Sequence, residues 1–432
     1  MSTTEDAAKL SGDNVAAVIS NDSVACDSAL SSAADTLRGA RVGFVSGRLH
    51  YRGNGEIWSD AGLGRLINAL EAKASCFTAA LCPAREKTAL FDHRLTLAPD
   101  NVLALPEMPT IARGFGKFRG CRRIIREVEE RSDVVIVQLP FEAPLALSRP
   151  TKPRLYHICA DIWAVAKGSS RFAGWKRLPA LGMGAVIDSL QAGLFRRPNV
   201  RVITNGESLQ EHYGSPAGRA VVSATIRATE MGSVARSRPL GAPFRVLYVG
   251  FLRPEKGIDL LVKAFDRVLD VLPNAELEIV GARDGGSRGM MAEFEQSIAD
   301  LGRKGTVRFL GQRPYGVDLF QCFADGDVLV VPSRMEGTPR VLIEARAFRC
   351  PVIATTVGGN PTSIRDGVDG LLIPPEDVGA LTDAVLRIVQ DRSLRELLIA
   401  NGLERARRST LEAYADAIAA EASLLLMKPG AN

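Results

Sequence analysis

In the second half of the chain, short apolar runs rich in Val, Ile and Leu alternate with longer stretches of helical periodicity. The short runs predict buried strands and the longer stretches predict amphipathic helices. Because parallel strands need a helical crossover, this alternation predicts a doubly wound parallel sheet. The expected strands are 244–250, 275–281, 307–311, 327–333, 350–355 and 370–374, and the expected helices are 259–272, 290–304, 319–326, 339–348 and 380–391.

The first half carries the same kind of pattern less regularly. Residues 1–38 are rich in Ser, Ala, Asp and Thr, which is typical of a mobile tail. Gly, Ser and Pro between residues 228 and 243 indicate a linker. We therefore expect two α/β domains, 39–235 and 236–405, and a C-terminal helix within 406–432 that packs back on the first domain. The first domain has expected strands at 41–47, 133–140, 154–161 and 200–206 and an expected helix at 61–74.

The composition agrees with two globular domains. The chain has 432 residues, of which 46% are hydrophobic and 24% are charged. No apolar run reaches the roughly 18 to 20 residues that span a bilayer, and the start of the chain lacks the pattern of a signal peptide. These features predict a cytoplasmic protein. The seven cysteines lack CxxC spacing, so neither a zinc site nor a disulfide framework is predicted.

The net charge of +5 is modest and does not indicate a nucleic-acid partner, but the charge is unevenly placed. Segments 113–126 and 167–178 combine Arg and Lys with Phe and Trp. Such segments suit an anionic membrane surface or an acidic substrate, although a solvated basic face is the simpler explanation.

Ligands of open α/β sheets lie beyond the carboxyl ends of the strands. Three loops expected there carry unusual residues: GFLRPEKG (250–257), SRMEGTP (333–339) and VGGNP (357–361). In the first loop, Arg253 and Lys256 directly precede a helix. Two cations at a helix start suit a diphosphate, although an Arg/Lys turn is more often plain surface.

In the second loop, Thr338 and Pro339 predict a helix start, with Thr338 as the N-cap. Glu336 then lies in the loop, and Glu344 lies roughly 8 Å along the helix. A ligand with phosphates at the helix start can place a sugar at Glu336 and a ribose by Glu344. The alternative for Glu344 is an ion pair with Arg340 one turn earlier.

Other features around the crevice are less specific. The backbone amides of Arg340 and Val341 are expected to point into it. Gly358 and Gly359 let the backbone approach a ligand closely, although Gly-Gly is also a common plain turn. The DGD at 325–327 has the spacing of a metal-binding DxD motif. It precedes a strand at the opposite end from the crevice, so we expect a solvated turn and no metal there.

Taken together, residues 244–390 resemble the donor-binding half of the retaining GT-B glycosyltransferases of family 4 (glycosyl transferases group 1), through VLYVGFLRPEKG, EGTPRVLIE and VGGNP in order. The resemblance implies two Rossmann-like domains facing across a cleft, with the acceptor on the first and a nucleotide sugar on the second. It implies no metal and no other cofactor. By this resemblance Lys256 holds the diphosphate, Glu336 lies beside the transferred sugar and Glu344 on the ribose. The backbone from Gly337 to Val341 cradles phosphate and sugar hydroxyls.

Two departures from the family pattern concern expected site residues. Phe251 stands where many members have an arginine, and we expect Arg253 to take over its role. Ile136 and Gln138 stand where the family often has histidines in a D-x-x-H-x-H pattern. Gln138 still offers a hydrogen bond to a sugar hydroxyl.

The acceptor half offers fewer signals. Asp161 follows a strand and precedes Trp163, a pair that suits a sugar because an aromatic face packs on C–H groups while a carboxylate accepts hydroxyls. A buried capping Asp explains the same position equally well. His157 is expected to be a core residue. Residues 52–65 resemble the family's flexible loop that faces the donor phosphates, and their candidate residues are Asp60, Gly62, Gly64 and Arg65.

The leading hypothesis is a retaining glycosyltransferase that moves a hexose-type sugar to a glycan or lipid-linked acceptor in cell-envelope or exopolysaccharide synthesis. It would work in the cytoplasm or at the inner face of the membrane. The alternative is a nucleotide-sugar-binding protein without turnover, motivated by the absent His and Arg. A dinucleotide oxidoreductase has the right fold class but lacks a full G-x-G-x-x-G after either first strand.

Overall fold

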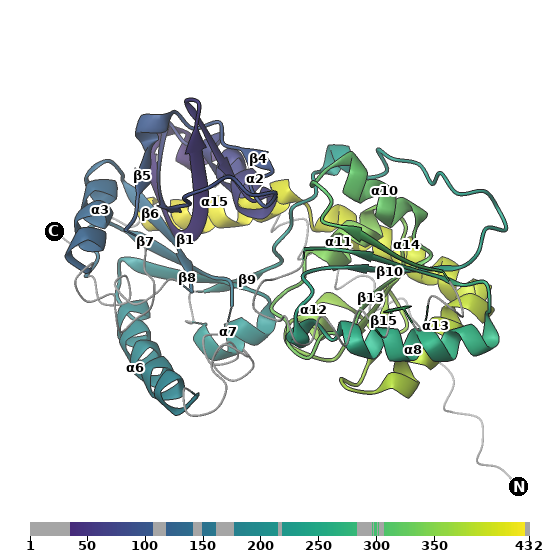
Figure 1. The fold of residues 1–432 in the computed structure, drawn as a ribbon. Coiled ribbons are helices and arrows are strands. Elements are labelled where there is room, and N and C mark those ends of the chain that lie inside the picture. The colour runs from purple at the N-terminus through teal and green to yellow at the C-terminus, as the bar shows by residue number, and fades with distance from the viewer. Residues whose placement is uncertain are drawn as a thin grey trace, which may run out of the picture.

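The computed structural model describes residues 35–106, 118–140, 149–160, 177–214, 218–282 and 306–427, with residues 296, 298, 299 and 301 between the last two ranges. These residues form two α/β domains that lie side by side (Figure 1). The expected tail up to residue 34, Asp161, Trp163 and most of the helix expected at 290–304 lie outside the described residues. So do parts of both basic segments.

The first domain is a mostly parallel sheet. Its strands are β1 (Arg41–Gly53), β2 (Glu56–Ser59), β3 (Cys76–Pro83), β4 (His93–Arg94), β5 (Val102–Ala104), β6 (Val134–Leu139), β7 (Arg154–Ile158), β8 (Val200–Asn205) and β9 (Arg219–Val221). β1 pairs in parallel with β3 and β6, and parallel pairing continues from β6 through β7 and β8 to β9. Its helices include α2 (Ala61–Glu71), α3 (Phe118–Glu130), α6 (Arg177–Phe195) and α7 (Glu207–Tyr213), with 3-10 turns at Asp35–Gly39 and Pro99–Asn101.

Residues 52–65 are not one flexible loop, so this expectation is wrong. β1 and β2 form an antiparallel hairpin through the turn at Asn54 and Gly55. Both turn residues have positive φ, 54° and 74°, which Asn and Gly adopt with little strain. α2 follows at once, capped by the Asp60 carboxylate, which accepts the amide of Leu63 at 3.1 Å. The Asn-Gly dipeptide is the signal that predicts such a hairpin.

The second domain is a parallel sheet in the order β12-β11-β10-β13-β14-β15. Its strands are β10 (Arg245–Val249), β11 (Glu276–Val280), β12 (Thr306–Gly311), β13 (Val328–Val331), β14 (Val352–Thr355) and β15 (Leu371–Ile373). Its helices include η8 (Pro254–Lys256), α8 (Ile258–Val271), α10 (Val317–Asp325), α11 (Val341–Ala347), α12 (Asn360–Ser363), α13 (Val378–Gln390) and α14 (Arg392–Arg408). The prediction of two Rossmann-like domains is thereby confirmed. No helix among the described residues combines the length and apolar character needed to cross a bilayer.

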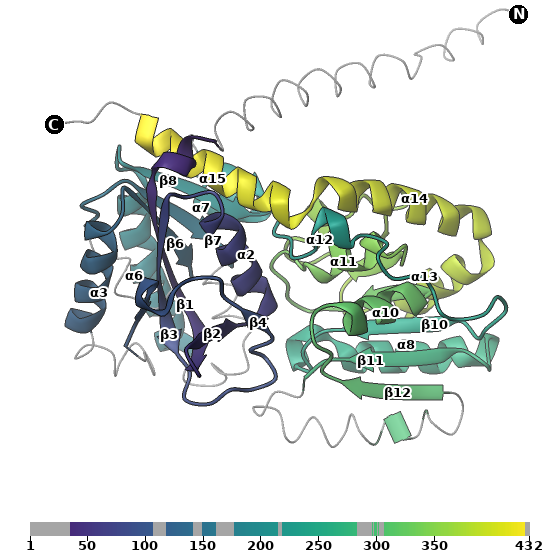
Figure 2. The same ribbon diagram turned by 90° about the horizontal axis from the view of Figure 1, so that it is seen from above.

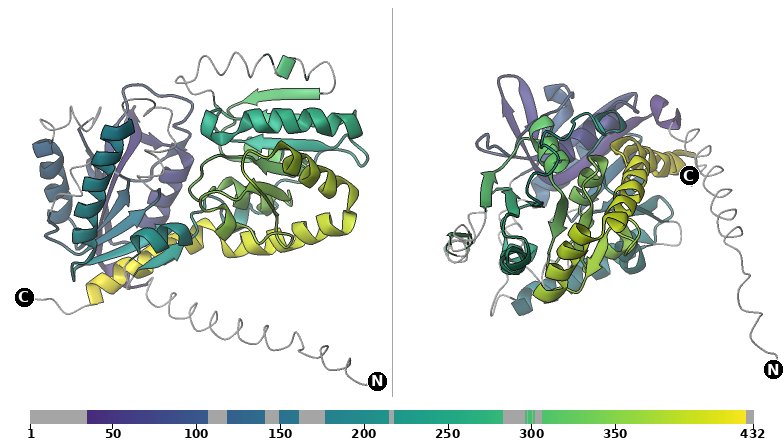
Figure 3. Two further views of the ribbon diagram at one scale, coloured as in Figure 1. Left: turned by 90° about the horizontal axis from the view of Figure 1, so that it is seen from below. Right: turned by 90° about the vertical axis from the view of Figure 1, so that its right-hand side faces the viewer.

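The chain crosses between the domains twice. The first crossing links β9 to β10 and includes the short turn η7 (Ala228–Glu230). The second follows α14, after which α15 (Leu411–Met427) packs on α2 and on β6, β7 and β8 of the first domain. Figures 2 and 3 show α15 continuing from α14 across the first sheet. The two crossings touch, because the amide of Leu411 donates to the carbonyl of Ile226 at 2.8 Å.

The helix that carries the predicted site, α11, is anchored by a buried ion pair. The guanidinium of Arg346 donates to the Asp369 carboxylate at 2.8 Å and to the carbonyls of Ser363 and Asp369. The side chains of Arg346 and Asp369 are 1% and 0% exposed. Burial lowers the pKa of Arg346 to about 10, although the Asp369 charge opposes this. Arg365 pairs with the same carboxylate from the surface, with 62% of its side chain exposed.

We expect Arg346→Ala to lower the free energy of unfolding by about 3–5 kcal/mol, because it removes one partner of a buried ion pair. Arg365→Ala is the matched control, since its exposed pair with the same Asp369 should contribute less than about 1 kcal/mol. Urea unfolding followed by circular dichroism measures both. Equal losses in the two variants would contradict the expectation.

Candidate functional site

A cavity of about 400 Å³ lies between the two domains, beyond the carboxyl ends of β10 and β13. Several predicted residues line it together: Asp60, Gly62, Lys256, Glu336, Thr338, Pro339, Arg340, Val341 and Glu344. The structure therefore gathers residues from α2, η8 and the loop before α11 around one space. The predicted residues Gln138, Gly64, Arg65, Arg253, Gly337, Gly358 and Gly359 are described but are not among its lining residues.

Lys256 and Glu336 form an ion pair in this cavity. Nζ of Lys256 lies 2.6 Å from Oε1 of Glu336, which also accepts the hydroxyl of Ser333 at 2.7 Å. Gly257 has φ 64°, and a Cβ there would lie 2.0 Å from the carbonyl oxygen of Pro332, so the two loops pass in close contact. An ammonium group has three donors. Lys256 can therefore hold Glu336 and still offer donors to an anionic ligand.

The start of α11 differs from the expectation. The helix begins at Val341, and Arg340 occupies the N-cap position without a side-chain capping bond. The hydroxyl of Thr338 donates instead to the carbonyl of Asn205 in the first domain at 3.0 Å. The prediction of Thr338 as N-cap is wrong because this contact between the domains takes its hydroxyl. The loop before α11 is thereby tied to β8.

Glu344 lies in the first turn of α11 with its side chain buried against the cavity. Burial raises the pKa of its carboxyl, and the positive charges of Arg340 and Arg65 oppose this rise. The guanidinium of Arg340 lies against Gly62, where a Cβ would come 1.6 Å from Nη1. A buried carboxyl at the wall of a cavity is suited to accept hydroxyl groups of a ligand.

Gly358 and Gly359 support the loop that carries Glu336 from behind. Gly358 has φ 54°, and a Cβ there would lie 1.9 Å from the carbonyl oxygen of Glu336. The amide of Gly359 donates to the carbonyl of Gly337 at 2.8 Å. Any side chain at Gly358 would therefore displace the loop. In this structure the two glycines shape the loop that a ligand would meet.

Arg253 stacks on Phe251, with its guanidinium carbon 4.8 Å from the ring centroid. Phe251 lines the cavity, and the idea that Arg253 replaces the family arginine stays a prediction. Two cations that the sequence analysis missed also line the cavity, Arg48 and Arg313. Arg313 follows the end of β12, so the rule that ligands meet strand ends would have found it. Arg48 lies within β1 and pairs with Asp60 at 2.8 Å.

Two further candidates on α2 face away from the cavity wall. Gly64 lies against His93, where a Cβ would come 2.7 Å from the ring. Arg65 is buried, pairs with Glu230 at 2.5 Å and lies 4.9 Å above the ring of Tyr315. Tyr315 itself lines the cavity. Arg65 therefore does not line the cavity itself, but it packs on Tyr315, which does.

Gln138 lies at the end of β6, where its Oε1 accepts the hydroxyl of Ser46 at 2.8 Å. His157, on the neighbouring strand, is buried and bonds to Asn205 Oδ1 and to the hydroxyl of Tyr414, both at 2.9 Å. The prediction that His157 is a core residue is confirmed. Since Asn205 also accepts from the loop before α11, this polar cluster connects β7, α15 and the cavity loop.

The DGD at 325–327 is more than a solvated turn. The Asp325 carboxylate accepts the amide and hydroxyl of Ser237, both at 2.7 Å. Asp327 pairs with Arg236 at 2.8 Å and with Arg238 at 3.0 Å. Both carboxylates thus hold the linker before β10. Among the residues that the structure describes, no group of three or more His, Cys, Asp or Glu side chains has the arrangement of a metal site.

Comparisons with known proteins point to one family. Residues 235–405 match the family model described as glycosyl transferases group 1. The D-inositol 3-phosphate glycosyltransferase of Stackebrandtia nassauensis is 35% identical over 200 residues, which cover 43% of this chain and 45% of that protein. The corresponding enzyme of Corynebacterium jeikeium is 32% identical over 197 residues, covering 44% of this chain and 46% of the relative. The chain spans about half the length of these curated relatives.

Solved structures match over most of the chain. Anabaena HepE in complex with UDP-glucose is similar with a TM-score of 0.64 and 19% identity, covering 88% of this chain and 98% of that one. Sucrose-phosphate synthase of Thermosynechococcus elongatus has the same TM-score and identity, covering 87% of this chain and 96% of that one. At this identity the likeness shows the fold. Both domains therefore share the GT-B arrangement of these structures.

Burial of Glu344 predicts a pH-dependent loss of stability. A carboxyl with a raised folded-state pKa destabilises the fold as pH rises above its ordinary value of 4.5. We expect Glu344→Gln to raise the melting temperature, with a larger difference from the unmodified protein at pH 8 than at pH 5. Glu396→Gln, on the exposed face of α14, is the control and should change little. A difference independent of pH, or a lower melting temperature for Glu344→Gln, would refute the expectation.

Proposed function

On the premise that residues 235–405 belong to the glycosyl transferases group 1, we propose that this protein is a retaining glycosyltransferase. It transfers a hexose-type sugar from a nucleotide-sugar donor to a glycan or lipid-linked acceptor in cell-envelope or exopolysaccharide synthesis. The observation that carries the proposal is the convergence of Lys256, Glu336 and Glu344 on one cavity between the domains.

The cavity suits an extended anionic donor. Lys256, Arg313 and Arg340 line it and can bind a diphosphate through charge-assisted hydrogen bonds. Glu336 is held by Lys256 and Ser333 and would accept hydroxyls of the sugar. Glu344, further into α11, would accept hydroxyls of the ribose. The two carboxylates thereby bind two ends of one ligand.

Transfer requires stabilisation of a transition state with positive charge on the sugar and of the negative charge that builds on the leaving diphosphate. The cations of the cavity supply the second requirement, because they stay in place while that charge develops. The proton of the acceptor hydroxyl passes to the departing phosphate in this proposal. Gln138, Asp161 and Trp163 of the first domain are proposed to position the acceptor.

No metal or other cofactor is needed in the proposed reaction. Fixed cations in the cavity neutralise the diphosphate, and the carboxylates of Asp325 and Asp327 are engaged by the linker. Turnover should therefore persist with excess EDTA.

The decisive experiment incubates the protein with a panel of UDP-, GDP- and ADP-sugars and candidate acceptors and detects released nucleotide. We expect turnover with one donor and a loss of at least about a thousandfold in Glu336→Gln, since the variant removes a charge beside the reacting sugar. Glu255→Gln, directly before Lys256 on η8 but not among the residues that line the cavity, is the control that should keep its rate. The anomeric proton coupling of the product, measured by NMR, tests retention.

Two outcomes of this experiment would contradict the proposal. Donor binding without turnover for every acceptor would favour the alternative, a nucleotide-sugar-binding protein. An unchanged rate in Glu336→Gln would show that the site is misassigned.

We further propose that the protein binds peripherally to the cytoplasmic face of a membrane. α3 exposes Arg119, Arg122, Arg123 and Arg126 to solvent. On α6 the large apolar side chains Leu178, Val186 and Leu190 are exposed. α3 and α6 both lie on the side of the first domain that faces away from the second domain (Figures 1 and 2). A basic surface and exposed apolar side chains on the same side of the domain suit anionic lipid.

Replacing the four α3 arginines by Gln should weaken sedimentation with vesicles of phosphatidylglycerol and phosphatidylcholine at least tenfold, since each cation contributes about 1 kcal/mol. Replacing Arg387 of α13 and Arg392, Arg395 and Arg407 of α14 by Gln is the control with equal charge. Equal binding by both variants would refute the membrane surface.

A further inference from the structure

A second and larger cavity, of about 1000 Å³, lies where the chain crosses between the domains. Its wall includes both crossings, with Val222 and Arg227 from the first and Arg408, Ser409 and residues 411–413 from the second. It also includes β9 and α7 of the first domain and Thr362 of the second. We call it the hinge cavity. It is separate from the cavity of about 400 Å³ that contains Lys256, Glu336 and Glu344, which we call the donor cavity. No lining residue is common to the two.

The hinge cavity is basic. Among the described residues that line it, the cations are Arg38, Lys73, Arg219, Arg227, Arg405 and Arg408, and the acids are Glu207, Glu412 and Asp416. Two of the acids are already engaged, because Asp416 forms an ion pair with Lys73 and Glu412 accepts the amide of Ala228 at 3.1 Å. The lining therefore carries six cations and three acids, although Arg405 and Arg408 also pair with acids outside the lining, Asp369 at 3.7 Å and Glu404 at 3.0 Å.

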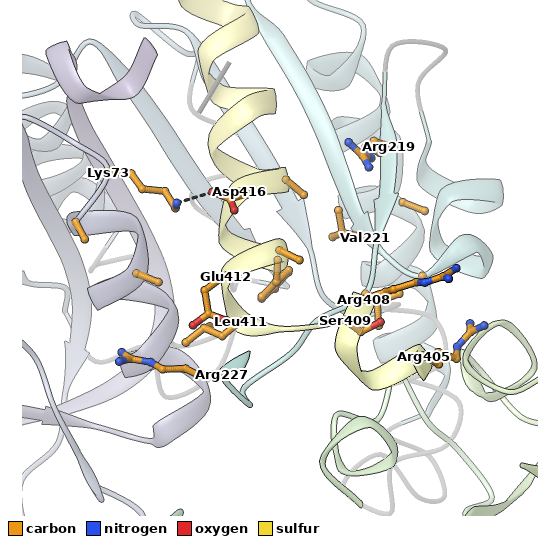
Figure 4. Close-up of a pocket in the computed structure, with 18 of the residues that line it drawn as sticks. Lys73, Arg219, Val221, Arg227, Arg405, Arg408, Ser409, Leu411, Glu412 and Asp416 are labelled. Atoms are coloured by element: carbon orange, nitrogen blue, oxygen red, sulfur yellow. Dashed lines mark hydrogen bonds and ion pairs between the residues drawn. The ribbon is translucent and has the colours of Figure 1, made fainter. Parts of the chain in front are cut away.

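Three arginines of this cavity come from both sides of the hinge. Figure 4 shows Arg219 on β9 together with Arg405 and Arg408 at the end of α14, all on one side of the first turns of α15. Lys73 and its partner Asp416 lie toward the other side (Figure 4). Arg219 belongs to the first domain and the other two to the second. A ligand that binds all three must touch both domains.

Arg219 and Arg408 are available to a ligand. Arg219 is partly exposed and has no carboxylate within ion-pair distance among the described residues. Arg408 pairs with Glu404 at 3.0 Å, but 75% of its side chain is exposed, so the pair is weak. Arg405 is more firmly placed, with Nη2 donating to the carbonyl of Thr362 at 2.6 Å. Guanidinium groups arranged in this way suit phosphate oxygens, which they bind through paired donors.

We propose that the hinge cavity binds an anion with more than one phosphate group, held by Arg219 from the first domain and by Arg405 and Arg408 from the second. Its size and its separated cations fit an elongated polyanion better than a single phosphate. Because the ligand touches both domains, its binding favours the relative placement of the domains that this structure shows.

The hinge cavity and the donor cavity share a thin wall. Gly206 lines the hinge cavity, and a Cβ there would lie 2.9 Å from the hydroxyl of Thr338, which lines the donor cavity. Thr362 also lines the hinge cavity and donates to the carbonyl of Gly359 at 3.0 Å. Gly359 supports the donor loop. A ligand at the hinge is therefore expected to change donor affinity, a consequence that rests on the proposed function.

The test is isothermal titration with sodium tripolyphosphate at about 150 mM NaCl, where screening limits nonspecific attraction. We expect Arg219→Ala and Arg408→Ala each to lower the affinity about tenfold or more, because each removes a charge-assisted contact. Arg407→Ala is the matched control: Arg407 also pairs with Glu404 and is exposed, but it does not line the cavity. Circular dichroism confirms that the variants fold.

Three results would overturn the hinge site. They are no binding by the unmodified protein, equal binding by Arg219→Ala, Arg408→Ala and Arg407→Ala, or loss of all binding in Lys256→Ala, which would assign tripolyphosphate to the donor cavity. If the unmodified protein binds tripolyphosphate but turns over no sugar-nucleotide donor, the proposed function is refuted and the hinge site still stands. With an active donor, tripolyphosphate should change the rate of the unmodified protein and not that of Arg408→Ala.

Discussion

Helix α15 begins next to the second domain and ends on the sheet of the first, and the rest of the structure depends on this packing. Its buried side, with Ala415, Ile418, Ala419 and Ala422, packs beside α2 on the same face of the first sheet and covers β6, β7 and β8 there. The same apolar cluster includes Leu319 and Phe320 of α10 and Leu342 of α11. Burial of this cluster therefore stabilises each domain and the contact between them together. Two covalent crossings and a common core restrict how the domains can move relative to one another.

The loop before α11 is held from three directions. Lys256 and Ser333 hold the side chain of Glu336, Gly358 and Gly359 pack behind its backbone, and Thr338 is bonded to Asn205 across the cleft. A binding loop that is ordered in advance loses less entropy when a ligand arrives. Through the hydrogen bond from Thr338 to Asn205, the loop also contacts the first domain. A change in the angle between the domains would therefore act directly on the residues proposed to bind the donor.

The second domain was predictable from the sequence because its strands are continuous apolar runs and its loops carry Lys256, Glu336 and Glu344 at strand ends or helix starts. The cavity confirms that these three residues lie together. The start of α11 was mispredicted because local propensity favours Thr338 as a cap, whereas a distant carbonyl, that of Asn205, competes for the same hydroxyl. The hairpin formed by β1 and β2 was missed, although its turn residues Asn54 and Gly55 signal it. Arg48 was beyond sequence reasoning, since its place at the cavity depends on the long-range packing of β1 beside Asp60 at the start of α2.

The position of α15 has a consequence for how the protein is made. The first domain emerges from the ribosome more than a hundred residues before the helix that completes it, and domains generally fold as units in order of synthesis. Until residues 411–427 are released, the part of the first sheet's face formed by β6, β7 and β8 stays open to solvent with its apolar side chains uncovered. The growing chain therefore passes through a long interval in which a chaperone can bind that face, and α15 must displace it to finish folding.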